Sequence, residues 1–247
     1  MDKLIKSIEK YRFNTFIEDE NTENIEINCE MISKTNFDIN GNLLLSITYD
    51  KNGNIAEHIE YKYNTNNQLI EELIFDENEI VEKRNFEYNN DNLLILEKIF
   101  YQDDYFDTFN YNYNENKQLI EKKLINSDNE FESMIKFTYN DDKLINESEY
   151  NAEMELTDEK SYIYDDKMNL IKFLHYNSLD DNTKQTIYEY DEANRRSKTL
   201  NYDDKGNLIS RSTYKYNEKD QIETLIEDTT LQSLSYKLYY DDENNMI

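Results

Sequence analysis

The chain has 247 residues, of which 54 are acidic and 27 are basic, so its formal net charge is -27. Such a polyanion repels nucleic acid and anionic membranes, which excludes both as expected partners and favours a basic protein partner; alternatively, the charge only keeps a sheet-rich protein soluble. Apolar residues make up 37% of the chain, but 22 tyrosines and 11 phenylalanines recur periodically, and disordered chains lack such phasing, so we expect an ordered protein with little core per residue.

Proline and cysteine usage narrows the class further. The chain has no proline, which suits an unbroken run of paired strands because each proline removes a ladder hydrogen bond. The single cysteine, Cys29, excludes an internal disulfide and is expected to be a buried thiol. The first residues lack the apolar region of a signal peptide, and no stretch approaches the ~18 apolar residues of a membrane helix. We expect a cytoplasmic protein, with export by a route without a cleaved signal as the alternative.

Residues 1–24 carry a pattern that differs from the rest of the chain. Leu4, Ile5, Ile8 and Tyr11 fall at helical spacing, which predicts a short amphipathic cap helix. Residues 18–24 are polar and are expected to form a loop. The pattern from residue 25 to residue 247 is one of strands and turns, and it defines the predicted repeat domain.

A tyrosine followed by Asp or Asn recurs through this domain every 24 to 26 residues. Fixed self-similarity of this kind is typical of repeat architectures. A second series of aromatic or aliphatic residues followed by Asp, Asn or Gln runs between the members of the first. The repeat-defining tyrosines are Tyr63, Tyr88, Tyr113, Tyr139, Tyr164, Tyr190, Tyr216 and Tyr240.

One repeat consists of two strands and two turns. Ile59, Tyr61 and Tyr63 alternate with charged residues at period two, which predicts a strand. Residues 64–68 are rich in Asn, which favours a turn, and residues 69–75 return as the next strand. Connections this short permit only antiparallel neighbours, so we predict an all-β meander of about sixteen or seventeen strands. Open sheets rarely exceed ~10 strands without curling, and the predicted sheet is therefore curled or spiralling.

The alternation also predicts the composition of the two faces. An inner, aromatic face is expected to carry Ile59, Tyr61, Tyr63, Leu69, Leu73, Phe75, Phe86 and Tyr88. The other face is expected to carry Glu60, Lys62, Ile70, Glu72, Ile74, Lys83 and Glu87. Glu71, Glu82 and Glu121 fall within strands on the presumed inner face. They are candidates for a glycosidase-type carboxylate pair or, more simply, polar residues of a wet inner surface.

Other chemistry-bearing residues favour structural roles. His58 and His175 are the only histidines, and repeats separate them from each other and from Cys29. Residues 38–42 and 50–54 resemble the opening of a calcium loop, but the twelfth position of each is tyrosine where an EF-hand needs glutamate. We predict no catalytic residues, no metal site and no cofactor. The one basic neighbourhood is expected to pair with nearby acids; it contains Arg195, Arg196, Lys198, Lys205, Arg211, Lys215 and Lys219.

Several segments resemble the RHS/YD-repeat family, whose consensus reads roughly Tyr-x-Tyr-Asp-x-x-Gly-Asn-Leu. The matching segments are residues 37–43, 49–55, 188–191, 200–209 and 214–217. The resemblance extends over about residues 37–247 and implies a spiralling antiparallel sheet, which in that family often forms a shell around a toxin domain. This chain is much shorter than a closed shell, has no proline for the family's self-cleavage motif, and has no distinct toxin domain after the repeats. It therefore looks like a small free-standing relative.

These observations predict a non-catalytic protein-binding module. The narrower hypothesis is an acidic immunity protein that binds and neutralises a basic toxin domain, because the family is embedded in toxin systems and acidic inhibitors steer to basic enzymes. The alternative is an exported cell-surface or shell-type protein that binds glycans through exposed tyrosines, although the chain has no tryptophan. An enzyme is the least favoured reading.

Overall fold

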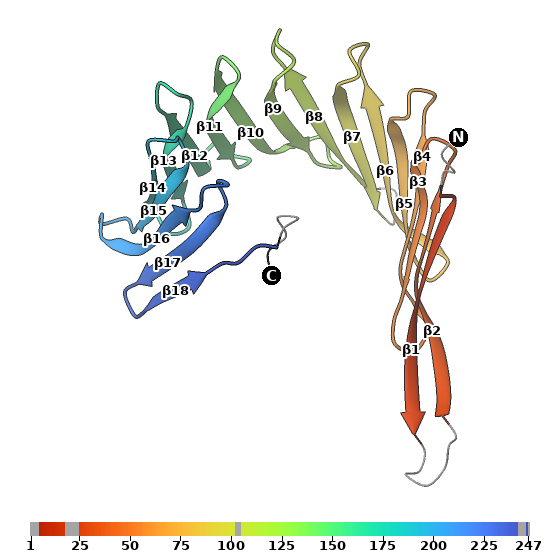
Figure 1. Ribbon diagram of the computed structural model, residues 1–247. Coiled ribbons are helices and arrows are strands. Elements are labelled where there is room, and N and C mark those ends of the chain that lie inside the picture. The colour runs from red at the N-terminus through yellow and green to blue at the C-terminus, as the bar shows by residue number, and fades with distance from the viewer. Residues whose placement is uncertain (1–4, 18–24, 102–104, 242–245, 247) are drawn as a thin grey trace. The chain divides into compact units, whose positions relative to one another are not determined.

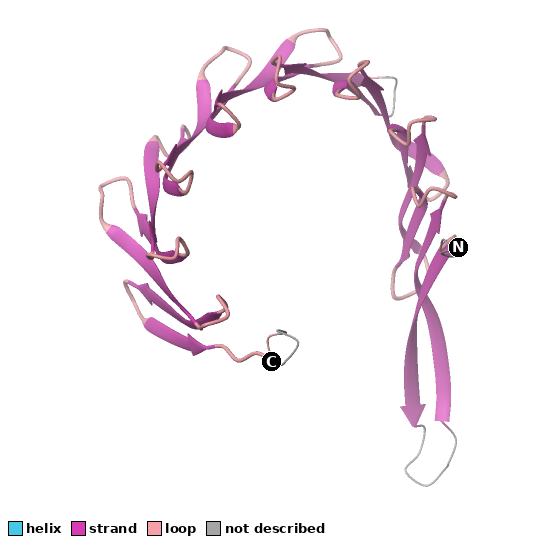
Figure 2. Cartoon of the chain, turned by 45° about the horizontal axis from the view of Figure 1, so that its top comes forward, coloured by secondary structure: helices cyan, strands magenta, loops and turns pink. Residues whose placement is uncertain are grey.

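The computed structural model describes residues 5–17, 25–101, 105–241 and 246, and these residues form an all-β fold (Figure 1). Eighteen strands belong to one sheet, and the described residues contain no helix. Each strand from β1 to β7, and each from β10 to β17, pairs antiparallel with its successor. In the same sheet, β9 pairs with β8 and with β10. Short loops join the strands (Figure 2). The predicted antiparallel meander of two-strand repeats is confirmed.

The strands are seven to thirteen residues long, apart from the five-residue β18. The first nine are β1 (Ser7–Ile17), β2 (Ile25–Phe37), β3 (Leu43–Tyr49), β4 (Ile55–Tyr63), β5 (Leu69–Asp76), β6 (Glu79–Tyr88), β7 (Leu94–Tyr101), β8 (Phe106–Tyr113) and β9 (Leu119–Ile125). The others are β10 (Phe131–Asn140), β11 (Lys143–Tyr150), β12 (Leu156–Tyr164), β13 (Leu170–Asn177), β14 (Asn182–Tyr190), β15 (Arg196–Tyr202), β16 (Leu208–Tyr216), β17 (Ile222–Thr229) and β18 (Ser233–Lys237).

The predicted N-terminal helix is wrong. Residues 7–17 form strand β1, which pairs with β2 from Ser7 opposite Asn36 to Ile17 opposite Ile25. The helical spacing of the apolar residues has no core to pack against, since Ile5 and Ile8 are 61% and 48% exposed. Pairing with β2 satisfies the backbone without such a core. The predicted polar loop at 18–24 lies outside the described residues.

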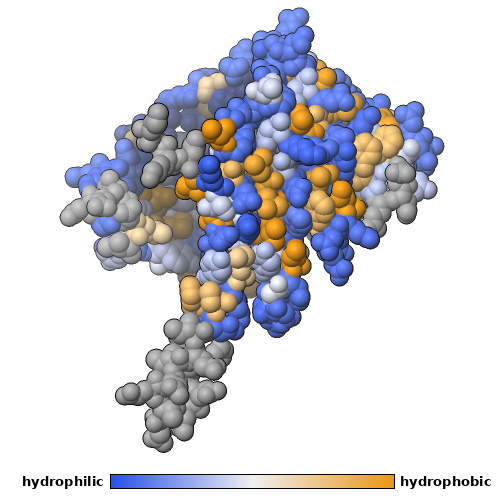
Figure 3. All heavy atoms as spheres, turned by 90° about the vertical axis from the view of Figure 1, so that its right-hand side faces the viewer, coloured by the Kyte–Doolittle hydropathy of each residue, from blue (hydrophilic) through white to orange (hydrophobic). Residues whose placement is uncertain are grey.

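The chain divides into two compact units. Unit 1 comprises residues 1–117 and 123–131, and unit 2 comprises residues 118–122 and 132–247. Among the described residues, the buried apolar side chains are Ile99 in unit 1 and Met134 in unit 2. On the face seen in Figure 3, apolar side chains form bands that alternate with hydrophilic ones. The expectation of little core per residue is therefore correct, and most side chains are packed between neighbours on a single-layered sheet.

Most turns share one hydrogen-bonding pattern, which the residue after the aromatic position creates. The Asp50 side chain accepts hydrogen bonds from the backbone N–H groups of Asn52 and Asn54, at 2.8 and 2.9 Å. The backbone N–H of Asp50 donates to the carbonyl of Asn54, and Gly53 donates back to Asp50. Gly53 has a φ of 82°, the left-handed conformation that a three-residue hairpin loop with a bulge requires. This explains the glycine of the repeat consensus.

The register shifts by one residue beside most of the repeat tyrosines. Tyr63 lies opposite Leu69, whereas Lys62 lies opposite Glu71, so Ile70 is an extra residue in β5. A β-bulge of this kind interrupts the period-two alternation of side chains. Equivalent shifts occur at Tyr88, Tyr139, Tyr164, Tyr190 and Tyr216.

The bulge corrects the predicted faces. Leu73 and Phe75 lie on the face opposite the tyrosines, while Glu72 and Ile74 lie with them. The prediction failed because it continued the alternation from Leu69 through the bulge. In unit 1 the tyrosine face carries Ile59, Tyr61, Tyr63, Leu69, Glu72, Ile74, Glu82, Arg84, Phe86 and Tyr88. The back face carries Glu60, Lys62, Glu71, Leu73, Phe75, Lys83 and Glu87.

Candidate functional site

The repeat tyrosines make a repeated bond to the backbone. The Tyr88 hydroxyl donates to the carbonyl of Leu69 at 2.9 Å, two residues beyond the last pair of β5 with β6, Glu71 opposite Asn85. The hydroxyl therefore supplies a donor where the strand ladder has ended. The same bond links Tyr113 to Leu94, Tyr139 to Leu119, Tyr164 to Leu144, Tyr190 to Leu170, Tyr216 to Arg196 and Tyr240 to Ile222.

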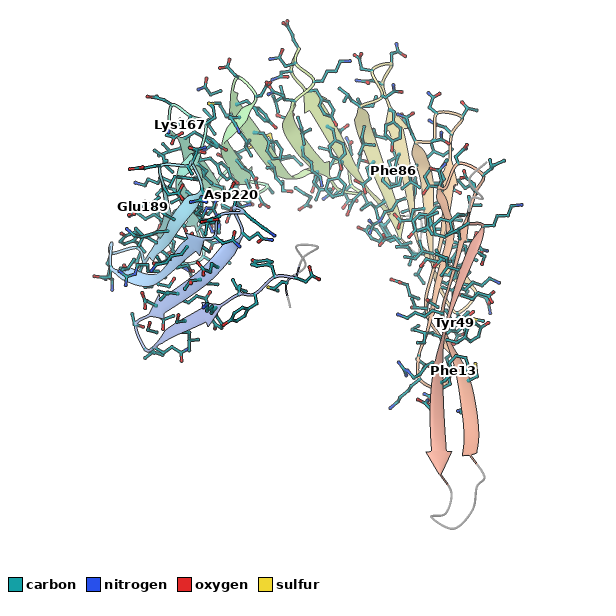
Figure 4. The ribbon with its side chains drawn as sticks, in the orientation of Figure 1. Phe13, Tyr49, Phe86, Lys167, Glu189 and Asp220 are labelled. Atoms are coloured by element: carbon teal, nitrogen blue, oxygen red, sulfur yellow. The ribbon has the colours of Figure 1, made fainter. Side chains whose placement is uncertain are left out.

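The turns that follow the repeat tyrosines, here called the tyrosine turns, are tied to one another. In unit 1, Asn40 and Asn42, from the corresponding turn after Phe37, both donate to the Asn67 side chain, and Lys117 pairs with Asp91 at 2.8 Å. In unit 2, Arg195 bonds Asp191 within its own turn and Asp220 of the next tyrosine turn. Asp220 and Lys167, from another tyrosine turn, are labelled in Figure 4. Lys117 and Arg195, together with amide side chains, therefore hold neighbouring turns together at this end of the strands.

The turns at the other end of the strands carry unpaired acids. We name as the acidic turns residues 76–79 and 126–130 of unit 1 and residues 151–155 and 177–182 of unit 2. Their carboxylates are exposed, and none of them forms an ion pair within the described part of the chain. These carboxylates belong to Asp76, Glu77, Glu79, Asp128, Glu130, Glu153, Glu155, Asp180 and Asp181.

In unit 2, spacing makes the charges of the two acidic turns act together, because residues 151–155 and 177–182 form successive turns, whereas the turn between β7 and β8 separates the two acidic turns of unit 1. Successive turns at one end of an antiparallel meander are two strands apart, which is about 9.6 Å. This is close to the Debye length of ~8 Å at physiological ionic strength, so neighbouring turns contribute to one negative potential that salt weakens. Such a surface attracts a positively charged partner and accelerates its association.

The three glutamates singled out from the sequence do not form one carboxylate pair. Glu71 lies on the back face, where Lys62 and Lys83 both contact it, and its hydrogen bond with Lys62 lowers its pKa. Glu82 lies on the tyrosine face, opposite Ile74, and binds Arg84 at 2.5 Å. The bulge at Ile70 is again the reason for the separation. Glu121 is half-buried in β9 and belongs to unit 2.

A charged cluster in unit 1 was not predicted from the sequence. Arg84 on the tyrosine face lies within the electrostatic influence of Glu82, Glu72 and Glu97, and the Tyr111 hydroxyl donates to Glu97 at 2.7 Å. Burial raises the pKa of Glu72 and of Tyr111. The residues come from β5, β6, β7 and β8, so only the strand register brings them together.

A second cluster lies on the tyrosine face of unit 2. His175 Nε2 is 2.6 Å from Asp158, which also lies 3.8 Å from Lys160; Lys160 in turn bonds Glu147 at 2.6 Å. The contacts connect side chains of three neighbouring strands, β11, β12 and β13. Ser161, next to Lys160, faces the other way, because its partner in β13 is Leu174.

The remaining candidates are separate. His58 belongs to unit 1, where its ring stacks on Phe75 with centroids 4.3 Å apart. Cys29 is exposed, which corrects the expectation of a buried thiol; it lies in the outlying β1–β2 hairpin. Within the described residues, no group of three or more His, Cys, Asp or Glu side chains is placed to hold a metal. The described residues also contain no helix that could cross a membrane.

Comparison with known proteins gives only distant structural similarity. No protein-family model matches the chain, and no curated protein matches it. The crystal structure of TcdB2-TccC3-TEV aligns with 88% of this chain at 12% identity and a TM-score of 0.28, and this chain spans 16% of that one. A porin-like protein from Bacteroides uniformis ATCC 8492 aligns over 94% of both chains at 10% identity and a TM-score of 0.36. The resemblance to RHS/YD repeats therefore rests on the repeat itself.

Proposed function

We propose that this chain is a non-catalytic, cytoplasmic protein-binding module whose acidic turns bind a basic protein. The observation that carries the proposal is that the exposed carboxylates of the acidic turns have no ion-pair partner among the described residues, whereas at the tyrosine turns Asp91, Asp191 and Asp220 are held by Lys117 and Arg195. Unpaired carboxylates along a repeating surface steer and orient a cationic partner.

The narrower proposal is that the partner is a basic toxin domain and that this chain is the immunity protein that neutralises it. The resemblance of the repeat to toxin-associated RHS/YD sequences supports this choice. The absence of a catalytic assignment from the sequence agrees with an inhibitor that acts by occlusion. Co-expression of the chain with the product of the neighbouring gene, followed by co-purification, tests the identity of the partner.

Charge neutralisation tests which surface binds. A variant that neutralises four carboxylates of the acidic turns in unit 2 is expected to lose at least tenfold in association rate with the partner at low salt. The substitutions are Glu153→Gln, Glu155→Gln, Asp180→Asn and Asp181→Asn. A control with the same charge change at the tyrosine turns is expected to lose much less. Its substitutions are Asp142→Asn, Asp166→Asn, Glu192→Gln and Glu218→Gln.

Stopped-flow or surface plasmon resonance measurements over a range of NaCl concentrations give the rates. Equal loss in both variants would reject the acidic turns as the binding surface, and a partner whose association does not depend on salt would reject the electrostatic mechanism. Circular dichroism of both variants checks that the sheet is retained.

A second candidate, an exported glycan-binding protein, is favoured by one feature. A hollow of ≈ 400–490 Å³ recurs between tyrosine turns; in unit 1 it is lined by amide side chains, including Asn66 and Gln68, beside Phe86 and Tyr88, and an equivalent hollow in unit 2 contains Tyr188 and Tyr190. Planar amides beside aromatic rings suit sugar hydroxyls and apolar sugar faces. Binding on a glycan array that is lost in Phe86→Ala, but retained in the acidic-turn variant, would favour this candidate over the first.

A further inference from the structure

The last strand of unit 2 leaves one side of its backbone open. β18 pairs with β17 on one side, and no strand of the described residues pairs with its other side. All five residues of β18 are exposed. An open edge strand is a template for pairing with another chain unless charge or proline protects it. Here neither does, because residues 229–240 contain no proline and a single charged residue, Lys237, in a chain that is 33% charged.

The backbone bonds show which residues of β18 face outward. Leu238 donates to the carbonyl of Glu223, and Thr229 donates to the carbonyl of Gln232, at the two ends of a ladder in which Leu225 lies opposite Tyr236. Hydrogen-bonded pairs alternate along an antiparallel ladder. The backbone groups of Leu234 and Tyr236 therefore point to β17. Those of Ser233, Ser235 and Lys237 point away from it.

The outward-pointing backbone groups of Ser233, Ser235 and Lys237 are spaced so that a second copy of β18 can pair with them. In an antiparallel pair centred on Ser235, that residue lies opposite itself and Ser233 lies opposite Lys237 of the other copy. These are the residues with outward-pointing backbone groups, so about six N–H···O=C bonds can form without moving β17. Leu234 then lies opposite Tyr236 of the other copy in a non-hydrogen-bonded pair, where side chains approach most closely.

The exposed apolar side chains obey the same symmetry. Leu231 is 93% exposed, Tyr239 57%, Tyr236 42% and Leu234 41%. Centring the pair on Ser235 places Leu234 in register with Tyr236 of the other copy; Leu231 lies in the turn before β18 and Tyr239 lies beyond its last residue, so these two side chains flank the paired segment. A self-complementary patch of this kind is what a two-fold interface requires.

We propose that β18 is a homodimerisation edge, which pairs antiparallel with β18 of a second copy about a two-fold axis at Ser235. The contact is short, so the dimer is weak and forms at high protein concentration. Two chains of charge -27 repel each other, so added salt strengthens the dimer. This is the opposite of the salt effect expected for a basic partner, and failure of one proposal is therefore distinguishable from failure of the other.

Sedimentation equilibrium of the full chain tests the proposal. The average mass is expected to rise from 30.0 kDa toward about twice that value with protein concentration, and more steeply at higher NaCl. Ser235→Pro removes an outward N–H without touching the bonds to β17, because proline is tolerated on the solvent side of an edge strand; it is expected to weaken the dimer at least tenfold.

The matched control is Glu9→Pro on β1, the terminal strand of unit 1. The bond from Phe37 to Lys6 places the backbone of Glu9 on the outward side. Glu9→Pro is expected to leave the dimer intact. Loss of self-association in both proline variants would indicate a head-to-tail contact between β1 and β18 and would overturn the two-fold arrangement.

Cross-linking tests the register independently. In a Cys29→Ser background, Ser235→Cys brings the two cysteines to a Cα separation of about 5.5 Å, within the range of a disulfide. Mild oxidation is then expected to give a covalent dimer on a non-reducing gel. Ser233→Cys in the same background places the cysteines about 14 Å apart along the strands and is expected to stay uncross-linked. A chain that remains monomeric at all salt concentrations, or that cross-links equally at both positions, would contradict the proposal.

Discussion

The Asp or Asn that follows each aromatic position organises its turn with its own side chain. Where that residue is Asp165, the Asn169 amide donates to the carboxylate at 3.0 Å; where it is Asn217, it donates instead to the oxygen of Gln221 at 2.9 Å. The two side chains four residues apart are therefore complementary: the acceptor Asp165 is paired with the donor Asn169, and the donor Asn217 with the acceptor Gln221. The hydrogen bond from Asn169 lowers the pKa of Asp165, so this turn loses stability as the pH falls through that lowered pKa.

At the residue scale, the tyrosine hydroxyl has a testable energetic role. Tyr190→Phe leaves the carbonyl of Leu170 without its 2.9 Å donor and is expected to reduce the free energy of unfolding by about 1 kcal/mol. Tyr188→Phe is the control, because that ring contacts Arg196 and its hydroxyl makes no hydrogen bond within the described residues. Urea unfolding followed by circular dichroism measures both. Equal destabilisation by the two substitutions would assign the tyrosine's role to its ring.

At the scale of neighbouring strands, the bulge beside the tyrosine decides which side chains meet. It moves Glu72 onto the face of Glu82 and Arg84 and separates that group from Glu71 and Lys83. Each face therefore carries its own ion pairs, and the acids on the two faces are compensated by different bases. Strand-to-strand contacts in this sheet are consequently electrostatic as well as apolar.

The Arg84 cluster predicts a pH-dependent defect. Arg84→Met removes the charge that offsets Glu72, Glu82 and Glu97, and we expect a loss of about 2 kcal/mol near pH 7, between the values for exposed and buried pairs. The pKa of Glu72 is raised by burial, so the Glu72 carboxylate binds a proton more tightly in the folded state than in the unfolded state. The stabilisation that protonated Glu72 contributes is present at low pH and is lost as the pH rises through the pKa of Glu72 in the folded state.

The measurement compares wild type and Arg84→Met by urea unfolding at several pH values. The difference between the two proteins is expected to shrink from neutral pH toward pH ~5, as Glu72, whose pKa is raised by burial, takes up its proton. Lys62→Met on the back face is the control, since its partner Glu71 also contacts Lys83. A defect of constant size across this pH range would indicate lost packing of the arginine stem.

For the whole molecule, a net charge of -27 opposes the compact state. We expect the melting temperature to rise when NaCl increases from about 10 mM to about 150 mM, because the Debye length falls from ~30 to ~8 Å. The unit 2 acidic-turn variant should show a smaller rise. Differential scanning calorimetry at low protein concentration checks both, and a melting temperature that falls with added salt would mean that attractive ion pairs outweigh the repulsion.

The amino-acid sequence by itself determined the period, the strand-and-turn order and the antiparallel pairing, because these follow from local signals: alternation, Asn- and Gly-bearing turns and short connections. It did not locate the clusters around Arg84 and His175, whose members are far apart in sequence and meet only through strand register. The bulge at Ile70 and the pairing of residues 7–17 with β2 likewise depend on contacts with another strand. Only the tertiary structure decided which acids remain unpaired and which edge stays open, since both depend on the neighbours that each strand acquires on folding.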